Sequence, residues 1–197
     1  MDKKNKTLQE DYFNDVYRAN EDPWNFETSD YERDKYEVTV DALPRDRYKN
    51  AFEIGCSIGV LSRMLSQKCD RLLSVDAVEA PLIKARVALK DYPQVRVQKM
   101  AVPDQFPSDN FDLIVMSEVG YYLSMTDLER LKDEIIQHLE TNGHLLMVHW
   151  TPFVPDYPLT GDEVHDFFMQ SVGLGSSFKH LLCKRTESYR LDLFEKQ

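Results

Sequence analysis

The sequence predicts an α/β fold: a doubly wound, mostly parallel sheet covered by helices on both faces and preceded by an N-terminal helical cap. Short apolar runs alternate with amphipathic segments from residue 49 onward, as happens when each strand is followed by a crossover helix. The run FDLIVMSEV (111–119) is apolar on both faces, which is typical of a central parallel strand. A glycine-containing bend follows the first run, AFEI (51–54). A chain of 197 residues fits one domain, residues 1–197.

The first part of that domain, residues 1–48, is expected to be a helical cap or lid. It is rich in aromatic residues, and Asp22-Pro23 interrupts it because a residue before proline is pushed away from helix. The aromatic side chains either close over a ligand or form the apolar face of a cap helix packed on the sheet.

The cofactor-binding core is expected over residues 49–150. Pro81 stands where a first helical turn tolerates proline, and Ser124 or Thr126 can cap the last core helix. Asn142-Gly143 is expected to end that helix. The expected strands are 51–54, 71–76, 95–100, 111–119 and 144–150, and the expected helices are 60–67, 81–92 and 126–140.

Residues 151–197 are expected to supply a substrate-side loop, a helix and closing strands. The loop is rich in proline, and a short helix is expected over 163–170 with Asp162 as its cap. Two antiparallel strands then close the sheet. The alternating run SYRLDLFEK (188–196) is typical of an edge strand.

Composition limits the partners of the protein. A formal net charge of -10 argues against nucleic acid or an anionic membrane surface and allows a neutral or cationic small molecule. The three cysteines show no metal-ligand spacing, so no metal site is expected, and scattered thiols suit a reducing compartment. No secretory signal or run of ~18 apolar residues is visible, so the expected location is the cytoplasm. The sequence leaves the oligomeric state open.

The bend after the first strand carries the pattern ExGxxxG, from Glu53 through Gly55 to Gly59. Glycine permits positive φ and lets a ligand approach the backbone. A pyrophosphate site would instead show GxGxxG. The acidic Glu53 would repel a pyrophosphate but attract a ligand that carries an ammonium group.

The second strand ends in Asp76, about 20 residues after the first glycine, which is the spacing of a ribose-hydroxyl ligand. A ribose and an amino-acid-like ammonium group without pyrophosphate describe S-adenosylmethionine. In the alternative interpretation, Glu53 caps a buried backbone and Asp76 caps the following helix. The register of both carboxylates with five strands favours the cofactor.

These motifs resemble those of a known family. EIGCSIG, the strand-end Asp76, FDLIVMSEV and NGHLLMV are similar to the motifs of class I S-adenosylmethionine-dependent methyltransferases over residues 45–150, which have a Rossmann-like fold. DPWNF…YERDKYE and HWTPFVPDYPLTGDEVHDFF resemble the nodulation protein S (NodS-like) branch. The resemblance implies N-methylation of the free amine of a deacetylated chitin oligosaccharide.

The resemblance also implies a set of cofactor contacts. The bend would face the methionine portion, Asp76 the ribose and Ala77 or Val78 the adenine. Met100 stands where the family often has an aspartate, so adenine recognition would use backbone groups. The implied cofactor residues are Glu53, Gly55, Cys56, Ser57, Gly59, Asp76, Ala77, Met100, Ala101 and Ser117.

Two cap residues are added to this set. Arg33 is favoured as a ligand of the cofactor carboxylate because arginine can donate two parallel hydrogen bonds, although it can equally belong to a solvated helix face with Lys35. Trp24 is expected to close over the cofactor or to pack on the sheet.

The catalytic candidates are Glu118, Tyr122 and His149, from the ends of the fourth and fifth strands. His149 is expected to act as a general base, or else to be a hydrogen-bonded histidine without a chemical role. Glu118 and Tyr122 would orient an amine. The predicted function is methylation of a small molecule, most directly at nitrogen on an amino sugar. The alternatives are O-methylation with His149 as base and a non-catalytic protein that binds S-adenosylmethionine or S-adenosylhomocysteine.

Overall fold

The computed structural model describes residues 6–197, so the first five residues of the expected cap lie outside the described part. One seven-stranded sheet has the order β3-β2-β1-β4-β5-β7-β6. The pairs from β3 to β5 are parallel, and β7 is antiparallel to both of its neighbours. The strands are β1 (Ala51–Ile54), β2 (Leu72–Asp76), β3 (Val95–Lys99), β4 (Phe111–Ser117), β5 (Leu139–Trp150), β6 (Phe178–Arg185) and β7 (Tyr189–Lys196).

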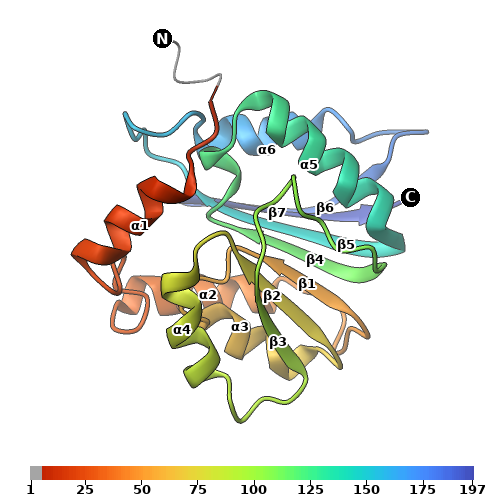
Figure 1. The fold of residues 1–197 in the computed structure, drawn as a ribbon. Helices are drawn as coiled ribbons and strands as arrows, with labels where there is room; N and C mark the ends of the chain where they lie inside the picture. Colours follow the sequence, from red (N-terminus) through yellow and green to blue (C-terminus); the bar gives the residue numbers. More distant parts are fainter. Residues whose placement is uncertain (1–5) are drawn as a thin grey trace.

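Helices cover both faces of the sheet, with α2, α3 and α4 on one side and α5 and α6 on the other (Figure 1). None of the helices described in residues 6–197 has the length and apolarity required to cross a membrane. The α-helices are α1 (Glu10–Ala19), α2 (Asp30–Asp41), α3 (Val60–Leu65), α4 (Glu79–Ala88), α5 (Met125–His138) and α6 (Gly161–Met169), and the short 3-10 turns are η2 (Ser66–Lys68) and η3 (Gly120–Tyr122).

Strand alternation divides the core between the two faces. On β1, Phe52 and Ile54 join the apolar cluster under α5 and α6, whereas Ala51 joins the cluster under α2 and α3. Successive side chains of a strand point to opposite faces, so Glu53 shares the face of Ala51. Glu53 therefore points toward the layer of α2 and α3.

The strand order reverses between β1 and β4, where β1 pairs with β2 on one side and β4 on the other. In an open α/β sheet, ligands bind beyond the carboxyl ends of the strands at such a point. The predicted class, a doubly wound mostly parallel sheet, is confirmed, and so are the five predicted core strands apart from their bounds.

Three local predictions were wrong. The helix α5 ends at His138 and β5 begins at Leu139, because Leu139 already pairs with Phe111 before a register shift. Asn142 and Gly143 therefore lie inside β5 and do not end the helix.

The edge strand is β6, whereas β7 lies between β5 and β6 and is mostly buried.

Thr160 caps α6 in a reciprocal capping box with Glu163. Asp162 instead pairs with Arg185 at the surface. Ser124, one of the two predicted caps of α5, does accept a hydrogen bond from the Asp127 amide, at 3.2 Å.

Candidate active site

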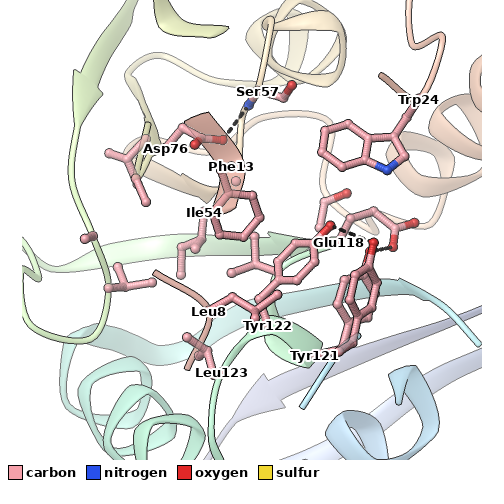
Figure 2. A pocket seen from close by; sticks show the side chains of 18 of the residues that line it. Leu8, Phe13, Trp24, Ile54, Ser57, Asp76, Glu118, Tyr121, Tyr122 and Leu123 are labelled. Atoms are coloured by element: carbon pink, nitrogen blue, oxygen red, sulfur yellow. Dashed lines mark hydrogen bonds between the residues drawn. The ribbon is translucent and has the colours of Figure 1, made fainter. Parts of the chain in front are cut away.

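A cleft of about 670 Å³ lies at the reversal point of the sheet. Its walls come from the ends of β1, β2 and β4, the segment after β3, and the N-terminal segment around α1. Figure 2 shows Asp76 and Ser57 on one side of this cleft and Glu118 and Tyr121 on the other. Pockets of this volume suit small molecules and cofactors.

The bend after β1 forms one wall of the cleft. Gly55 has φ +87°, and a Cβ there would lie 2.2 Å from the Val119 side chain. The Gly55 and Cys56 amides donate to the Val75 carbonyl at 2.8 and 2.9 Å, which fixes the bend against β2. Glycine at position 55 is therefore required by both conformation and space.

Asp76, at the end of β2, is half-buried and lines the cleft beside the bend. Its two oxygens accept hydrogen bonds from the Ser57 and Val78 amides, each at 3.1 Å. Burial raises the pKa of Asp76 to about 6, against the opposing effect of these amides. The carboxylate is therefore mostly ionised at pH 7 and is held in one orientation, as an acceptor for hydroxyl donors should be.

Glu53 does not line the cleft, which corrects the prediction that it contacts the ligand. The side chain is fully buried, and its Oε2 accepts from the hydroxyls of Ser62 on α3 and Ser74 on β2, both at 2.6 Å. Its Oε1 has no hydrogen-bond partner among the described residues. Burial raises the pKa of Glu53 to about 7. Glu53 thus lies beneath the bend, between helix and sheet.

Cys56 and Gly59 also lie outside the cleft lining. The Cys56 side chain is buried. Gly59 has φ +86°, and a Cβ there would approach Leu89 and Ala85 of the α4 region to 3.0 and 3.2 Å. The second glycine of the motif therefore permits close packing at the start of α3, and only the first borders the cleft.

The N-terminal segment forms the opposite wall. The Leu8 amide donates to the Tyr122 carbonyl at 2.9 Å, and the Tyr17 hydroxyl lies 2.7 Å from Ser57 Oγ. Phe13 and Trp24 line the cleft from this side (Figure 2). The cap therefore packs on the core and also borders the cleft, and closure of its aromatic residues over a ligand stays a prediction.

Among the basic residues of α2, Lys35 lines the cleft and Arg33 does not. The Lys35 side chain is 2 % exposed, with its Nζ 2.8 Å from Glu32 and 2.7 Å from Glu118. Burial lowers the pKa of Lys35, but Glu118 and Glu32 outweigh it, so the pKa lies above its ordinary value. The Arg33 side chain is 60 % exposed and pairs with Asp30. The predicted role of Arg33 is therefore corrected.

The helical spacing of α2 contained this distinction. Its buried residues recur three or four positions apart, so Lys35 falls on the buried stripe whereas Arg33 faces solvent. Tyr17 of α1 and Trp150 at the end of β5 also line the cleft.

Glu118 follows β4 in a left-handed backbone conformation, with φ +57°. Its Oε1 accepts from Lys35, and its Oε2 accepts from the Tyr121 hydroxyl at 2.6 Å and the Trp150 amide at 2.8 Å. The side chain keeps 14 % of its surface exposed and borders the cleft. Tyr122 lines the cleft beside it (Figure 2). A fixed carboxylate among aromatic rings suits a cationic or amine group.

His149 does not line the cleft, and its predicted role as a general base is corrected. The ring is fully buried, and its Nε2 accepts from the Gly120 amide at 3.0 Å. Burial and the neighbouring His165 and Lys35 hold the pKa of His149 well below its ordinary value. The lone pair that a base would use is therefore already occupied.

The other predicted contacts all border the cleft, apart from Val78, the alternative to Ala77. Their side chains or backbone come together from the cap, the bend and the ends of β2, β3 and β4. The predicted residues that line the cleft are Trp24, Gly55, Ser57, Asp76, Ala77, Met100, Ala101, Ser117, Glu118 and Tyr122.

Comparison with known proteins gives one family match. The model of the family described as Nodulation protein S (NodS) matches residues 6–149. Nodulation protein S of Sinorhizobium fredii strain NGR234 is 27 % identical over 130 residues, which are 65 % of this chain and 60 % of that protein. The matched segment spans 51–60 % of the length of three curated nodulation proteins S.

Solved structures share the fold. A methyltransferase candidate from Pseudomonas syringae is 37 % identical, with a TM-score of 0.74 over 84 % of this chain and 99 % of that chain. The N-methyltransferase NodS from Bradyrhizobium japonicum WM9, in complex with S-adenosyl-L-homocysteine, is 22 % identical. Its TM-score is 0.81 over 93 % of this chain and 97 % of that chain. The predicted class I methyltransferase fold is confirmed by these matches.

Proposed function

The chain belongs to the nodulation protein S family, and from this membership we propose that it is an S-adenosylmethionine-dependent methyltransferase that N-methylates a small molecule. The observation that carries the proposal is the pairing of two fixed carboxylates on one cleft. Asp76 lies at the end of β2 beside the glycine bend, and Glu118 lies across the cleft after β4. The first suits a nucleoside and the second suits an amine.

The residues at the Asp76 side fit the cofactor. A carboxylate held by two backbone amides can accept both ribose hydroxyls, whereas it would repel a pyrophosphate. Met100 and Ala101 would flank the adenine, and Gly55 and Ser117 would face the methionine portion. When bound, S-adenosylmethionine supplies an electrophilic methyl group that an amine lone pair can take, leaving S-adenosylhomocysteine.

The residues at the Glu118 side favour an amine acceptor. Lys35 pairs with both Glu32 and Glu118. One cation faces two carboxylates, so the formal charge of the cluster is negative. Tyr157 and Trp150 also line the cleft and offer faces on which a cation or a sugar ring can stack. An amino sugar or an oligosaccharide that carries a free amine is therefore the proposed acceptor.

Glu118 is assigned to orient the acceptor and not to remove its proton. Its two oxygens already accept from three donors: Lys35, Tyr121 and the Trp150 amide. Methyl transfer to a neutral amine needs alignment more than a base, so positioning can supply much of the catalysis. O-methylation would need a base to ionise a hydroxyl, and His149 is engaged by Gly120.

Calorimetric titration with S-adenosylhomocysteine tests the cofactor half of the proposal, with micromolar binding expected. Mass spectrometry then follows methyl transfer to glucosamine oligomers, with fully N-acetylated oligomers as the control acceptor. Glu118→Gln should raise KM for the amine, and the surface variant Arg33→Ala should not. Methylation of the acetylated oligomers would contradict N-methylation. Cofactor binding without transfer to any amine would instead favour a non-catalytic binding protein.

A further inference from the structure

A chain of buried hydrogen bonds runs from the turn after β4 to the middle of β7. The Gly120 amide lies 3.0 Å from His149 Nε2, and His149 Nδ1 lies 3.0 Å from His165 Nε2. His165 Nδ1 then lies 2.6 Å from Asp192 Oδ2. The three side chains are each 0 % exposed. They come from β5, α6 and β7, so the chain links the turn to the C-terminal third of the fold.

The donors and acceptors of this chain have one consistent assignment. A backbone amide only donates, so His149 Nε2 accepts and the proton of the neutral ring stands on Nδ1. That proton is donated to His165 Nε2, and the proton of His165 therefore stands on its own Nδ1. Asp192 accepts it at the end of the chain.

Asp192 is fixed as an anion at this end. Arg190 Nε donates to its Oδ2 at 2.6 Å, and His180 Nε2 lies 2.7 Å from its Oδ1. Burial would raise the pKa of Asp192, but His165 and Arg190 outweigh it, and the pKa lies below its ordinary value. A carboxylate at the end of a histidine chain fixes the tautomer and orientation of the rings before it.

Glycine at position 120 lets the imidazole reach the backbone. A Cβ there would lie 3.1 Å from His149 Nε2 and 2.5 Å from Val164 of α6. Without His149, the buried Gly120 amide would have no such acceptor, and an unpaired buried donor is costly. The site is thus built around this one hydrogen bond.

The anchored turn carries cleft residues. Glu118, Tyr121 and Tyr122 all line the cleft, and all lie within two residues of Gly120. Glu118 has a left-handed backbone, which persists only where the surrounding structure holds it. The hydrogen-bond chain ends at the Gly120 backbone amide, so none of its side chains passes a proton to a ligand in the cleft.

We propose that His149, His165 and Asp192 are positioning residues that anchor the Gly120 amide and thereby fix the acceptor side of the cleft. Their effect on methyl transfer rests on the proposed function, whereas their effect on the turn does not. The first test uses the wild-type protein with 15N-labelled histidine. Nitrogen chemical shifts should report the Nδ1–H tautomer for both His149 and His165. An Nε2–H tautomer or a protonated ring at His149 at pH 7 would overturn the assignment.

A matched pair of variants then separates anchoring from proton transfer. His149→Phe removes the acceptor, and His149→Gln replaces it with an amide oxygen that cannot act as a base. Exchange of the Gly120 amide hydrogen should accelerate at least tenfold in the first variant and return toward the wild-type rate in the second. Equal exchange in all three proteins would refute the anchor, whether or not any acceptor is methylated.

Kinetics with an amine acceptor that the protein methylates complete the test. His149→Phe should lower kcat/KM for the acceptor about tenfold or more while the Kd for S-adenosylhomocysteine stays within twofold, and His149→Gln should recover most of the loss. The surface variant Arg33→Ala, which lies outside this hydrogen-bond chain and outside the cleft lining, serves as the control with little change. A glutamine variant as inactive as the phenylalanine variant would contradict positioning. If His149→Phe does not fold, His165→Leu provides the same comparison against His165→Gln.

Discussion

Replacing Glu53 with glutamine is expected to remove a loss of stability that accompanies rising pH, without weakening cofactor binding. Glu53 is fully buried, one of its oxygens accepts from the hydroxyls of Ser62 and Ser74, and the other has no partner among the described residues. Burial raises its pKa to about 7. The ionised form is therefore disfavoured in the folded protein relative to the unfolded chain.

The magnitude follows from that pKa. A rise from the ordinary value of 4.5 to about 7 corresponds to about 3 kcal/mol, at about 1.4 kcal/mol for each pH unit. Between these values the folded state binds more protons than the unfolded state, so stability falls as pH rises from about 4.5 to about 7. Glutamine does not titrate, so this part of the decline should be absent from Glu53→Gln.

Urea unfolding of wild type and Glu53→Gln at pH 5, 6, 7 and 8 measures the effect. The difference in unfolding free energy should move in favour of the variant by up to about 3 kcal/mol from pH 5 to pH 8. Burying the glutamine amide can cost a fixed amount of stability, but that amount is the same at every pH and does not change the pH dependence of the difference. The Kd for S-adenosylhomocysteine should be unchanged, since Glu53 does not border the cleft. A pH-independent difference, or a large loss of affinity, would refute the reasoning.

Three further predictions concern the cleft. Affinity for S-adenosylhomocysteine should fall by nearly tenfold per pH unit below about 6, because protonated Asp76 cannot accept both ribose hydroxyls; calorimetry that finds a flat profile would contradict this. Lys35→Met leaves two carboxylates without their cation and should cost about 3–5 kcal/mol in denaturant unfolding, whereas Arg33→Ala should stay within about 0.5 kcal/mol. Gly55→Ala should destabilise the protein by at least about 1 kcal/mol and weaken cofactor binding, because residue 55 has φ +87° and a Cβ there would lie 2.2 Å from a Val119 methyl group. A thermal unfolding measurement that shows no loss of stability would argue against the tight bend.

The fold was predictable because the sequence encodes it locally. Four of the five core strands, β1 to β4, are runs of four to seven residues in the structure, and β1 is followed directly by Gly55. The errors arose where pairing with a distant strand decided the outcome. Leu139 extends β5 because it meets Phe111, and β7 is interior because β6 pairs on its outer side. Neither contact is visible in a local pattern.

The site was predictable where backbone geometry placed it and less so where side-chain direction mattered. Asp76 and Glu118 border the cleft because they end or follow strands that converge at the reversal point. Glu53 is only one residue before the end of β1, but strand alternation directs it toward α3. His149 likewise belongs to the end of β5, but its ring points toward α6, where His165 Nε2 lies 3.0 Å from His149 Nδ1.

Under the proposed function, the two carboxylates of the cleft bind chemically different ligands, and they are held in different ways. Asp76 is held by amides and remains available to hydroxyl donors, whereas Glu118 is held by Lys35, Tyr121 and a backbone amide. A carboxylate held by three donors cannot reorient easily, so it acts as a fixed negative potential. Fixed charges in a site shielded from water cost no reorganisation when a cation or developing charge arrives. Under the proposed function, these contacts hold the acceptor side in place, and the proposed His149 anchor extends the same principle from side chains to the backbone that carries them.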